Sequence, residues 1–212
     1  MTDLRVIEIY PSIQGESTRA GLPCTFVRLA GCPLRCRWCD TVYSFTGGES
    51  MSIEAIIEQV AAAGIGLVEV TGGEPLAQPG APELLTRLCD QFDQVLLETS
   101  GSFPVADLDP RVGVILDLKA PGSGEESRNL WDNLPRLKDG DELKIVIADR
   151  TDYEWACNVY REHRPTVPML FSPVFGELEP AQLSAWLIED QLPVRMQLQQ
   201  HKYIWDPEAR RT

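Results

Sequence analysis

The chain has 212 residues, 43% of them hydrophobic and 24% charged, and its formal net charge is −13 at pH 7. This composition is that of an ordinary globular protein, and the excess of acidic residues argues against direct binding of nucleic acid through its phosphates. No apolar run approaches the ~20 residues of a membrane-spanning helix, so we expect no membrane segment.

The length and the first residues suggest how and where the chain folds. No linker or internal repeat divides the sequence, so residues 1–212 are expected to form a single domain. The N-terminus lacks the basic start and the apolar core of a signal peptide, which favours a cytoplasmic protein. In that reducing compartment, closely spaced cysteines more often bind metal than form disulfides.

Two strands are predicted before the cysteine-rich stretch. Residues 4–10 alternate and are rich in β-branched side chains, and Pro11 then breaks the strand into a polar loop that runs to Ser17. Residues 24–30 form the next strand, which leads directly into the cysteines. Arg28 is a cation within this strand, and the pattern leaves open that it simply faces solvent on an edge strand.

Strands and helices alternate in the next part of the chain. Ser52 can cap a helix whose isoleucines follow i, i+3, i+4 spacing, and Gly64 ends it. Residues 67–71 and 94–99 are predicted strands. Residues 82–91 between them carry leucines on one face, which predicts a second helix.

The alternation continues in the second half of the chain. Strands are predicted at residues 112–118, 142–147 and 169–171. Thr151 and Glu154 have the spacing of a capping box, which predicts that a helix opens at Thr151, and Pro180 begins another helix. The segment 120–141 is polar, and residues 121–126 within it are expected to form a flexible loop.

Strands that alternate with helices through short turns predict parallel β/α units, of which we expect about six. A closed eight-unit barrel typically needs ~250 residues, so an open, incomplete (β/α)6-type TIM-like barrel of the α/β class fits this chain better. Barrels place their active sites at the carboxyl ends of their strands. The cysteines, the turn at 72–75, Ser100 and Lys119 all follow strands, which predicts one shared site.

Cys32, Cys36 and Cys39 stand at Cys-x3-Cys-x2-Cys spacing. Three thiolates from one loop can bind three irons of a 4Fe–4S cluster and leave the fourth iron open, whereas closed clusters and structural zinc sites take four protein ligands. Trp38 can pack over such a cluster and limit solvent. A chance grouping or a zinc loop is the alternative interpretation.

The turn Gly72-Gly73-Glu74-Pro75 is a second candidate motif. Its two glycines allow the backbone to approach a ligand closely, although a plain strand–helix turn is the simpler interpretation of these four residues alone. Lys119 ends a strand on the same rim, where it can pair with a carboxylate or remain solvated.

Together, the Cys-x3-Cys-x-aromatic-Cys loop and the Gly-Gly-Glu-Pro turn resemble the motifs of the radical S-adenosylmethionine (SAM) enzymes. The resemblance implies a barrel of the radical SAM type and a 4Fe–4S cluster whose open iron binds the amino and carboxylate groups of SAM. The residues that it places near SAM are Trp38, Cys39, Asp40, Gly73, Asp117, Leu118 and Lys119. Asp117 departs from the serine that is commoner in the family at this position.

Further motifs resemble a narrower family, the 7-carboxy-7-deazaguanine synthases, from about Tyr10 to Trp205. These are the stretch Ser-Ile-Gln-Gly-Glu-Ser, Arg28, the pair Asp40-Thr41 and the stretch 198–203. The resemblance implies conversion of 6-carboxy-5,6,7,8-tetrahydropterin to 7-carboxy-7-deazaguanine with loss of ammonia, in queuosine biosynthesis. It also implies Mg²⁺, a low-potential electron donor such as flavodoxin or ferredoxin, and a homodimer.

The same resemblance implies the residues that bind the substrate. They are Ile13, Gln14, Gly15, Glu16, Arg28, Thr71 and His201. Arg28 can hold the carboxylate of the substrate bidentately, and Glu16 can accept from an N–H of the pterin. Thr41 is implied as the magnesium ligand; Asp40 is the choice on charge alone, but we place it near SAM. His201 is equally well interpreted as a surface histidine.

Two other functions remain to be weighed. A glycyl-radical activating enzyme shares the cysteine motif and a modest size, but that function does not explain the Ser-Ile-Gln-Gly-Glu-Ser stretch. A non-catalytic iron–sulfur or zinc module requires a fourth protein ligand, for which Cys24 is the nearest cysteine upstream. Replacement of Cys24 by serine therefore distinguishes the module from the enzyme.

Overall fold

The computed structural model describes residues 3–211, which are arranged around one nine-stranded sheet in the order β3-β1-β2-β4-β5-β6-β7-β8-β9. The strands are β1 (Leu4–Ile13), β2 (Pro23–Leu29), β3 (Glu49–Met51), β4 (Leu67–Gly72), β5 (Gln94–Thr99), β6 (Gly113–Leu118), β7 (Glu142–Ile147), β8 (Met169–Pro173) and β9 (Arg195–Met196). From β2 to β9 all neighbours pair in parallel, whereas β1 pairs antiparallel with β2 and β3.

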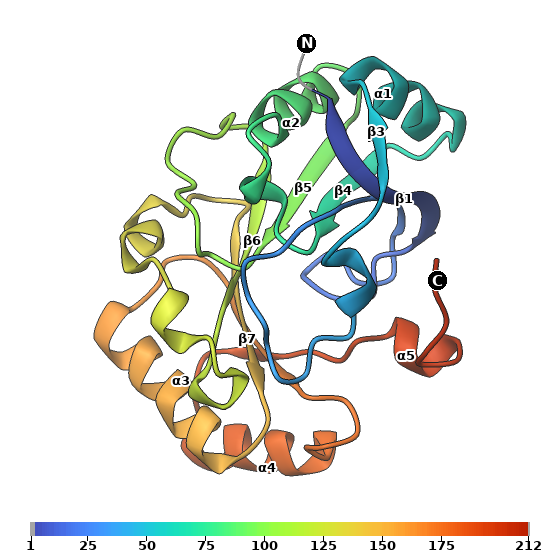
Figure 1. Cartoon of the computed structure of the whole chain (residues 1–212). Coiled ribbons are helices and arrows are strands. Elements are labelled where there is room, and N and C mark those ends of the chain that lie inside the picture. Colours follow the sequence, from blue (N-terminus) through green and yellow to red (C-terminus); the bar gives the residue numbers. More distant parts are fainter. Residues whose placement is uncertain (1–2, 212) are drawn as a thin grey trace.

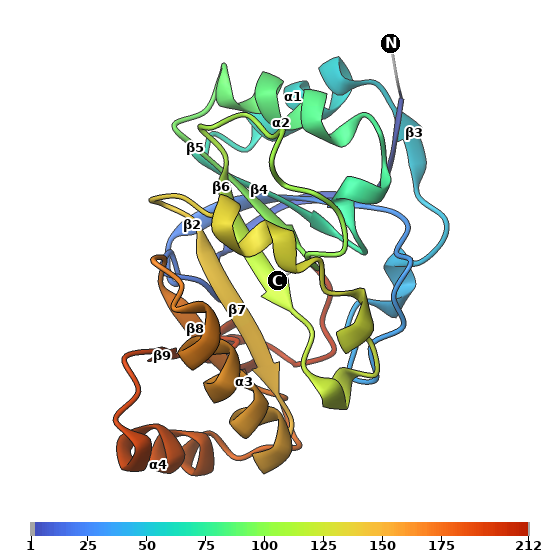
Figure 2. The ribbon, with the colours of Figure 1, turned by 90° about the vertical axis from the view of Figure 1, so that its left-hand side faces the viewer.

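The helices are α1 (Ile53–Ala62), α2 (Ala81–Cys89), α3 (Arg150–His163), α4 (Pro180–Asp190) and the short α5 (His201–Ile204). Figure 1 shows α1 and α2 beside β4 and β5, and Figure 2 shows α3 and α4 outside β7, β8 and β9. Because β3 and β9 form opposite edges, the described sheet stays open. The prediction of an incomplete barrel is therefore confirmed, although the β5–β6 and β6–β7 connections contain no α-helix.

Side chains that alternate along the strands separate an apolar outer face from a polar inner face. Val70, Leu97 and Ile145 belong to the large core under the helices. A smaller apolar cluster fills the amino-terminal end of the inner face and includes Phe26 and Ile115. The inner positions nearer the carboxyl ends are polar, so the sheet itself provides the wall of a polar cavity.

Pro11 does not end the first strand as predicted. β1 continues to Ile13, and Pro11 lies opposite Thr25 of β2. The neighbouring strand β3 pairs only with Leu4–Val6, so β1 has one partner at Pro11. A proline without an N–H is tolerated at such an edge.

The predicted capping box of α3 is wrong by two residues. The N-cap is Asp149, whose carboxylate accepts a hydrogen bond from the Asp152 N–H at 3.0 Å, and Thr151 lies within the first turn. We expect Asp149→Ala to lower the free energy of unfolding by about 1 kcal/mol. Thr151→Ala is the matched control, and a larger loss for Thr151→Ala in urea titrations would contradict this assignment.

Residues 121–126, predicted to be a flexible loop, begin with a short helix, and the segment 120–141 around them is not a loop throughout. It contains three short 3-10 helices, at Pro121–Ser123, Glu126–Arg128 and Trp131–Arg136. The buried side chain of Asn129 hydrogen bonds to both the N–H and the C=O of Lys119, each at 2.9 Å. The segment therefore fixes the backbone where β6 ends. No helix between residues 3 and 211 has the length and apolar character needed to cross a membrane.

Candidate active site

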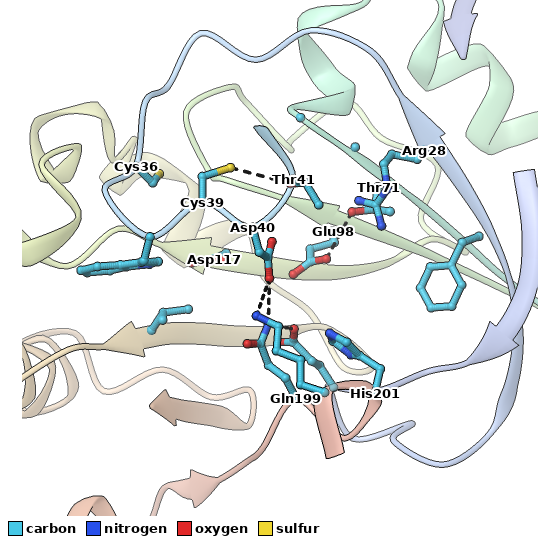
Figure 3. A pocket seen from close by; sticks show the side chains of 18 of the residues that line it. Arg28, Cys36, Cys39, Asp40, Thr41, Thr71, Glu98, Asp117, Gln199 and His201 are labelled. Carbon is cyan, nitrogen blue, oxygen red and sulfur yellow. Dashed lines mark hydrogen bonds and ion pairs between the residues drawn. The ribbon is translucent and has the colours of Figure 1, made fainter. Parts of the chain in front are cut away.

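A cavity of about 640 Å³ lies on the inner face of the sheet, toward the carboxyl ends of the parallel strands. This volume is typical of small-molecule sites. The predicted site residues that line it are Ile13, Gln14, Gly15, Glu16, Arg28, Cys32, Cys36, Trp38, Cys39, Asp40, Thr41, Thr71, Gly73, Asp117, Lys119 and His201. Figure 3 shows Cys36 and Cys39 at one end, Arg28 and Thr71 at the other, and Asp40 between them.

Leu118 is the one predicted site residue whose side chain lies elsewhere. It is 1% exposed and belongs to the core beneath the helices. The reason is the period of two along β6, which turns Asp117 toward the cavity and its neighbour away from it. The Leu118 side chain therefore does not line the cavity, and any contact of this residue with SAM would come from its backbone.

The three cysteines occupy the loop between β2 and the 3-10 helix Val42–Ser44, and each is partly exposed. Burial raises the pKa of the Cys32 and Cys36 thiols, so both favour the neutral form until a metal deprotonates them. Within residues 3–211, no three His, Cys, Asp or Glu side chains gather closely enough to hold a single metal ion. A cubane makes a different demand, because each of three thiolates binds a separate iron.

The Gly-Gly-Glu-Pro turn lies directly against the cysteine loop. The Glu74 N–H donates to the Gly31 carbonyl at 2.8 Å. A Cβ at Gly73 would lie 2.4 Å from that carbonyl oxygen and 2.7 Å from the Cβ of Cys32. Glycine is thus required at position 73 for the two motifs to meet, and the interpretation of a plain turn is insufficient.

Glu74 supports the turn and does not face a ligand. It is fully buried, and its carboxylate accepts from the Leu76 N–H at 2.9 Å, the Thr99 hydroxyl at 2.9 Å and the Ser100 N–H at 2.7 Å. The Ser100 hydroxyl adds a fourth donor, at 2.6 Å. This carboxylate therefore ties the end of β4 to the end of β5.

Replacement of Glu74 by glutamine is expected to lower the free energy of unfolding by about 3 kcal/mol, because an amide N–H would face the donors that the carboxylate now satisfies. Urea denaturation of the cluster-free protein measures the loss. The matched control is Glu83→Gln on the exposed side of α2. Equal stability of the two variants would contradict the structural role of Glu74.

Lys119 is held inside the cavity, so the alternative of a solvated lysine is wrong. Its side chain is 15% exposed, and its Nζ lies 3.1 Å from Oδ2 of Asp117. Burial by itself lowers the pKa of Lys119, but the charge of Asp117 outweighs burial and raises it, so the ammonium form is retained. The second oxygen of Asp117, Oδ1, is buried and has no partner among the described residues.

Arg28 does not face solvent on an edge strand. β2 lies between β1 and β4, and the side chain is 13% exposed. Its Nε donates to Glu8 at 2.9 Å and its Nη2 to the Tyr10 hydroxyl at 3.2 Å. A guanidinium has five N–H groups, so three remain for a ligand in the cavity.

The loop after β1 packs against the C-terminal segment. A Cβ at Gly15 would lie 2.3 Å from Nδ1 of His201, and the Gln200 N–H donates to the Gly15 carbonyl at 2.9 Å. His201 is thus a cavity residue, and the interpretation of a surface histidine is wrong. Burial lowers the pKa of His201, which favours the neutral imidazole.

Gln14 is bound by the protein itself. Its amide nitrogen donates to the buried carboxyl group of Glu69, and its amide oxygen accepts from the Glu16 N–H at 2.6 Å. Burial, with the nearby charges of Glu98 and Glu16, raises the pKa of Glu69 well above its usual value. A protonated Glu69 and Gln14 therefore brace the loop, and the Gln14 side chain keeps only one N–H for a ligand.

Several charged residues of the cavity were not identified from the sequence. Lys144 of β7 forms ion pairs with Glu98 of β5, with Glu16 at 3.0 Å and with Asp117 at 3.3 Å. Lys202 lies 2.8 Å from Asp40 and lowers the pKa of that carboxyl group against the effect of burial. The sequence does contain one signal for Glu98 and Lys144, because each is a charged residue within a largely apolar strand.

The comparisons with known proteins agree on one family. Residues 26–116 match the radical SAM superfamily. The chain is 50% identical to a 7-carboxy-7-deazaguanine synthase from Chlorobaculum tepidum, over 98% of this chain and 96% of that protein. It is 43% identical to a 7-carboxy-7-deazaguanine synthase from Koribacter versatilis, over 98% and 99%.

The fold is also similar to that in a crystal structure of QueE from Escherichia coli, with a TM-score of 0.77 and 22% identity over 94% of this chain and 95% of that chain. The superfamily match implies a 4Fe–4S cluster and SAM. Since whole-chain relatives at 43% and 50% identity carry the same name, the chain belongs to the 7-carboxy-7-deazaguanine synthase family of radical SAM enzymes.

Proposed function

We propose that this chain is a lyase that converts 6-carboxy-5,6,7,8-tetrahydropterin to 7-carboxy-7-deazaguanine with loss of ammonia, in queuosine biosynthesis. The observation that carries the proposal is a single cavity that joins the cysteine loop to the loop at residues 13–16 and to Arg28. The relatives that share this name align over almost the whole chain. They give no support to a glycyl-radical activating enzyme or to a non-catalytic metal module.

Cys32, Cys36 and Cys39 would hold the cluster, and SAM would lie in the cavity beside both the cysteine loop and the Gly-Gly-Glu-Pro turn. When bound, the cluster and SAM supply the radical that removes hydrogen from C6 of the pterin, whose ring then contracts. The backbone at Gly73 approaches this position without a side chain. Trp38 and Asp40, which line the same part of the cavity, would shield and orient the cofactor.

The end of β6 offers SAM one charge of each sign. The ammonium of Lys119 would pair with the carboxylate of SAM. Oδ1 of Asp117 is a buried acceptor without a partner among residues 3–211, and the amino group of SAM is a suitable donor for it. Aspartate can therefore replace the serine that is commoner here.

The pterin would bind at the other end of the cavity, where its carboxylate would meet the free N–H groups of Arg28. Glu16 would accept from an N–H of the ring, and Thr71 and His201 would complete the wall. Ile13, Gln14 and Gly15 would contribute mainly backbone groups, since the Gln14 amide is already engaged. These residues position the ring and exclude water.

Thr41 would supply the protein ligand of Mg²⁺. Its hydroxyl lies in the cavity, 3.7 Å from the Cys39 sulfur. Magnesium prefers hard oxygen ligands and keeps several waters, so one hydroxyl together with the substrate carboxylate is a sufficient set. Asp40 is less available because Lys202 pairs with it.

We further propose a cytoplasmic homodimer that is reduced by a low-potential donor such as flavodoxin or ferredoxin. Arg35 and Arg37 flank the cysteine loop and are exposed, so they give an acidic donor a local basic contact on a chain whose net charge is −13. Part of this local positive charge is already neutralised within the protein, because Arg37 pairs with Glu177 at 2.8 Å.

The experiment is anaerobic reconstitution with iron and sulfide, followed by reduction and incubation with SAM, Mg²⁺ and the carboxylated tetrahydropterin. We expect 7-carboxy-7-deazaguanine only when every component is present. SAM cleavage without this product would reject the assigned substrate. If the protein neither assembled a 4Fe–4S cluster nor cleaved SAM, the non-catalytic metal module would be the only remaining interpretation.

A further inference from the structure

Lys144 stands at the centre of the charged network in the cavity. Its side chain is 5% exposed, and its ammonium contacts carboxylates from three separate segments of the chain. These are Glu16 of the loop after β1, Glu98 of β5 and Asp117 of β6. Asp117 is the register partner of Lys144 on the paired strand β6, whereas β5 and the loop after β1 do not pair with β7, so the ammonium ties these two more distant segments to β7.

The hydrogen-bond capacities indicate how Lys144 acts. An ammonium has three N–H donors, of which two hydrogen bond to Glu16 and Glu98, and Asp117 lies 3.3 Å away as a third ion-pair partner. Glu16 also accepts from Gln197 at 3.2 Å and from Gln199 at 2.8 Å, which leaves one of its roughly four acceptor sites. The contacts of the Lys144 ammonium are thus with carboxylates of the protein, whereas the carboxylate of Glu16 can still accept a hydrogen bond from a ligand.

We propose that Lys144 is a positioning residue of the pterin subsite, which holds Glu16 ionised and fixed so that it accepts an N–H of the substrate. The inference rests on the proposed function and deepens it. Loss of Lys144 weakens substrate binding through Glu16, while the cysteines still hold the cluster and Asp117 keeps Lys119 as its partner at 3.1 Å on the SAM side.

The charges around Glu16 support this role. Burial raises the pKa of its carboxyl group, but Lys144 and the Gln199 hydrogen bond outweigh burial and lower it. The titratable groups on the neighbouring strands β4 and β5 are Glu69 and Glu98, which are acidic and therefore cannot replace the ammonium of Lys144 as the partner of Glu16. Without Lys144, burial dominates and the carboxyl group takes up a proton at higher pH.

The test compares Lys144→Met with Lys138→Met, in which an ion pair outside the cavity is lost. Both proteins are reconstituted, and their affinity for the unreactive, oxidised pterin-6-carboxylate is measured by fluorescence. We expect Lys144→Met to weaken this affinity and raise KM on the order of 100-fold. Cluster content and slow SAM cleavage without substrate should match those of Lys138→Met. Equal pterin affinity of the two variants would overturn the proposal.

The pH profile separates positioning from a general structural role. Substrate binding requires ionised Glu16, so wild-type kcat/KM falls only at low pH, where this carboxylate is protonated. In Lys144→Met the acidic limb should move to higher pH, and alkaline buffer should restore part of the affinity. A profile that keeps its shape and falls uniformly would contradict a role through Glu16.

A double variant covers the case in which Lys144→Met does not fold. Glu16→Gln combined with Lys144→Met removes one charge of each sign, and Asp117 keeps Lys119 as its partner. Pterin affinity should be nearly the same in Glu16→Gln and in the double variant. A further 100-fold loss in the double variant would refute the inference. If the wild-type protein binds pterin-6-carboxylate but forms no product, the proposed reaction fails and the binding test still stands.

Discussion

Replacement of Cys36 or Cys39 by serine is expected to abolish both the 4Fe–4S cluster and the cleavage of SAM. The three cysteines of the loop are the only ones of the six that line the cavity in the described structure. A serine hydroxyl is a far weaker iron ligand than a thiolate, and Cys24, Cys89 and Cys157 lie on β2, α2 and α3. Iron and sulfide content, visible absorption and released 5′-deoxyadenosine measure the effect.

Cys89→Ser is the matched control, because Cys89 is also partly exposed but does not line the cavity. It should assemble the cluster and form product at the wild-type rate. Cys24→Ser should likewise keep the cluster. The variant protein should be less stable than the wild type, because the new hydroxyl group is buried. Loss of the cluster in either variant would indicate a fourth protein ligand and would support a closed metal module.

Gly73→Ala is expected to reduce SAM cleavage on the order of 100-fold or more. The added methyl carbon would lie 2.4 Å from the Gly31 carbonyl oxygen and 2.7 Å from the Cβ of Cys32. Neither atom can yield without moving the loop that holds the cluster. The variant should therefore misplace the cysteines and the turn together, and its dissociation constant for SAM should rise.

Gly113→Ala is the control for this substitution. Its Cβ would meet Cδ2 of Leu96 at 2.9 Å, at the end of a flexible side chain that can change rotamer. Equilibrium dialysis with SAM and the yield of 5′-deoxyadenosine compare the two proteins. If Gly73→Ala bound and cleaved SAM as well as Gly113→Ala, the turn would not define the SAM subsite.

The strands of the barrel could be predicted well because their signal is local. Gln94–Thr99 and Glu142–Ile147 are β5 and β7 with the predicted bounds, since each is an apolar run between turn residues. β3 and β9 have only three and two residues, too few for an alternating pattern. Their place at the sheet edges depends on tertiary pairing, which no local pattern reveals.

The candidate site could be predicted as a set of motifs but not as a network. The cysteine spacing and the glycine turn identify the SAM end because their chemistry is written in consecutive residues. Lys144 and Glu98 come from separate strands, and their ion pair depends on the register of β5, β6 and β7. Leu118 shows the limit of a contiguous motif, since its side chain faces the core while Asp117 and Lys119 on either side of it line the cavity.

The most direct test of the proposed reaction follows one hydrogen atom. The reconstituted protein is supplied with Mg²⁺, SAM and substrate that carries deuterium at C6, and the deazaguanine product and the recovered SAM are analysed by mass spectrometry. The substrate has the composition of the product plus ammonia, so the hydrogen that the radical removes must be returned, and on the way it shares a methyl group with two hydrogens of the 5′-carbon. We predict 7-carboxy-7-deazaguanine together with deuterium at the 5′-carbon of the recovered SAM and of any 5′-deoxyadenosine that is released. Release of unlabelled 5′-deoxyadenosine without the deazaguanine product would show that the pterin is not held at the radical, and it would contradict the assignment of this cavity.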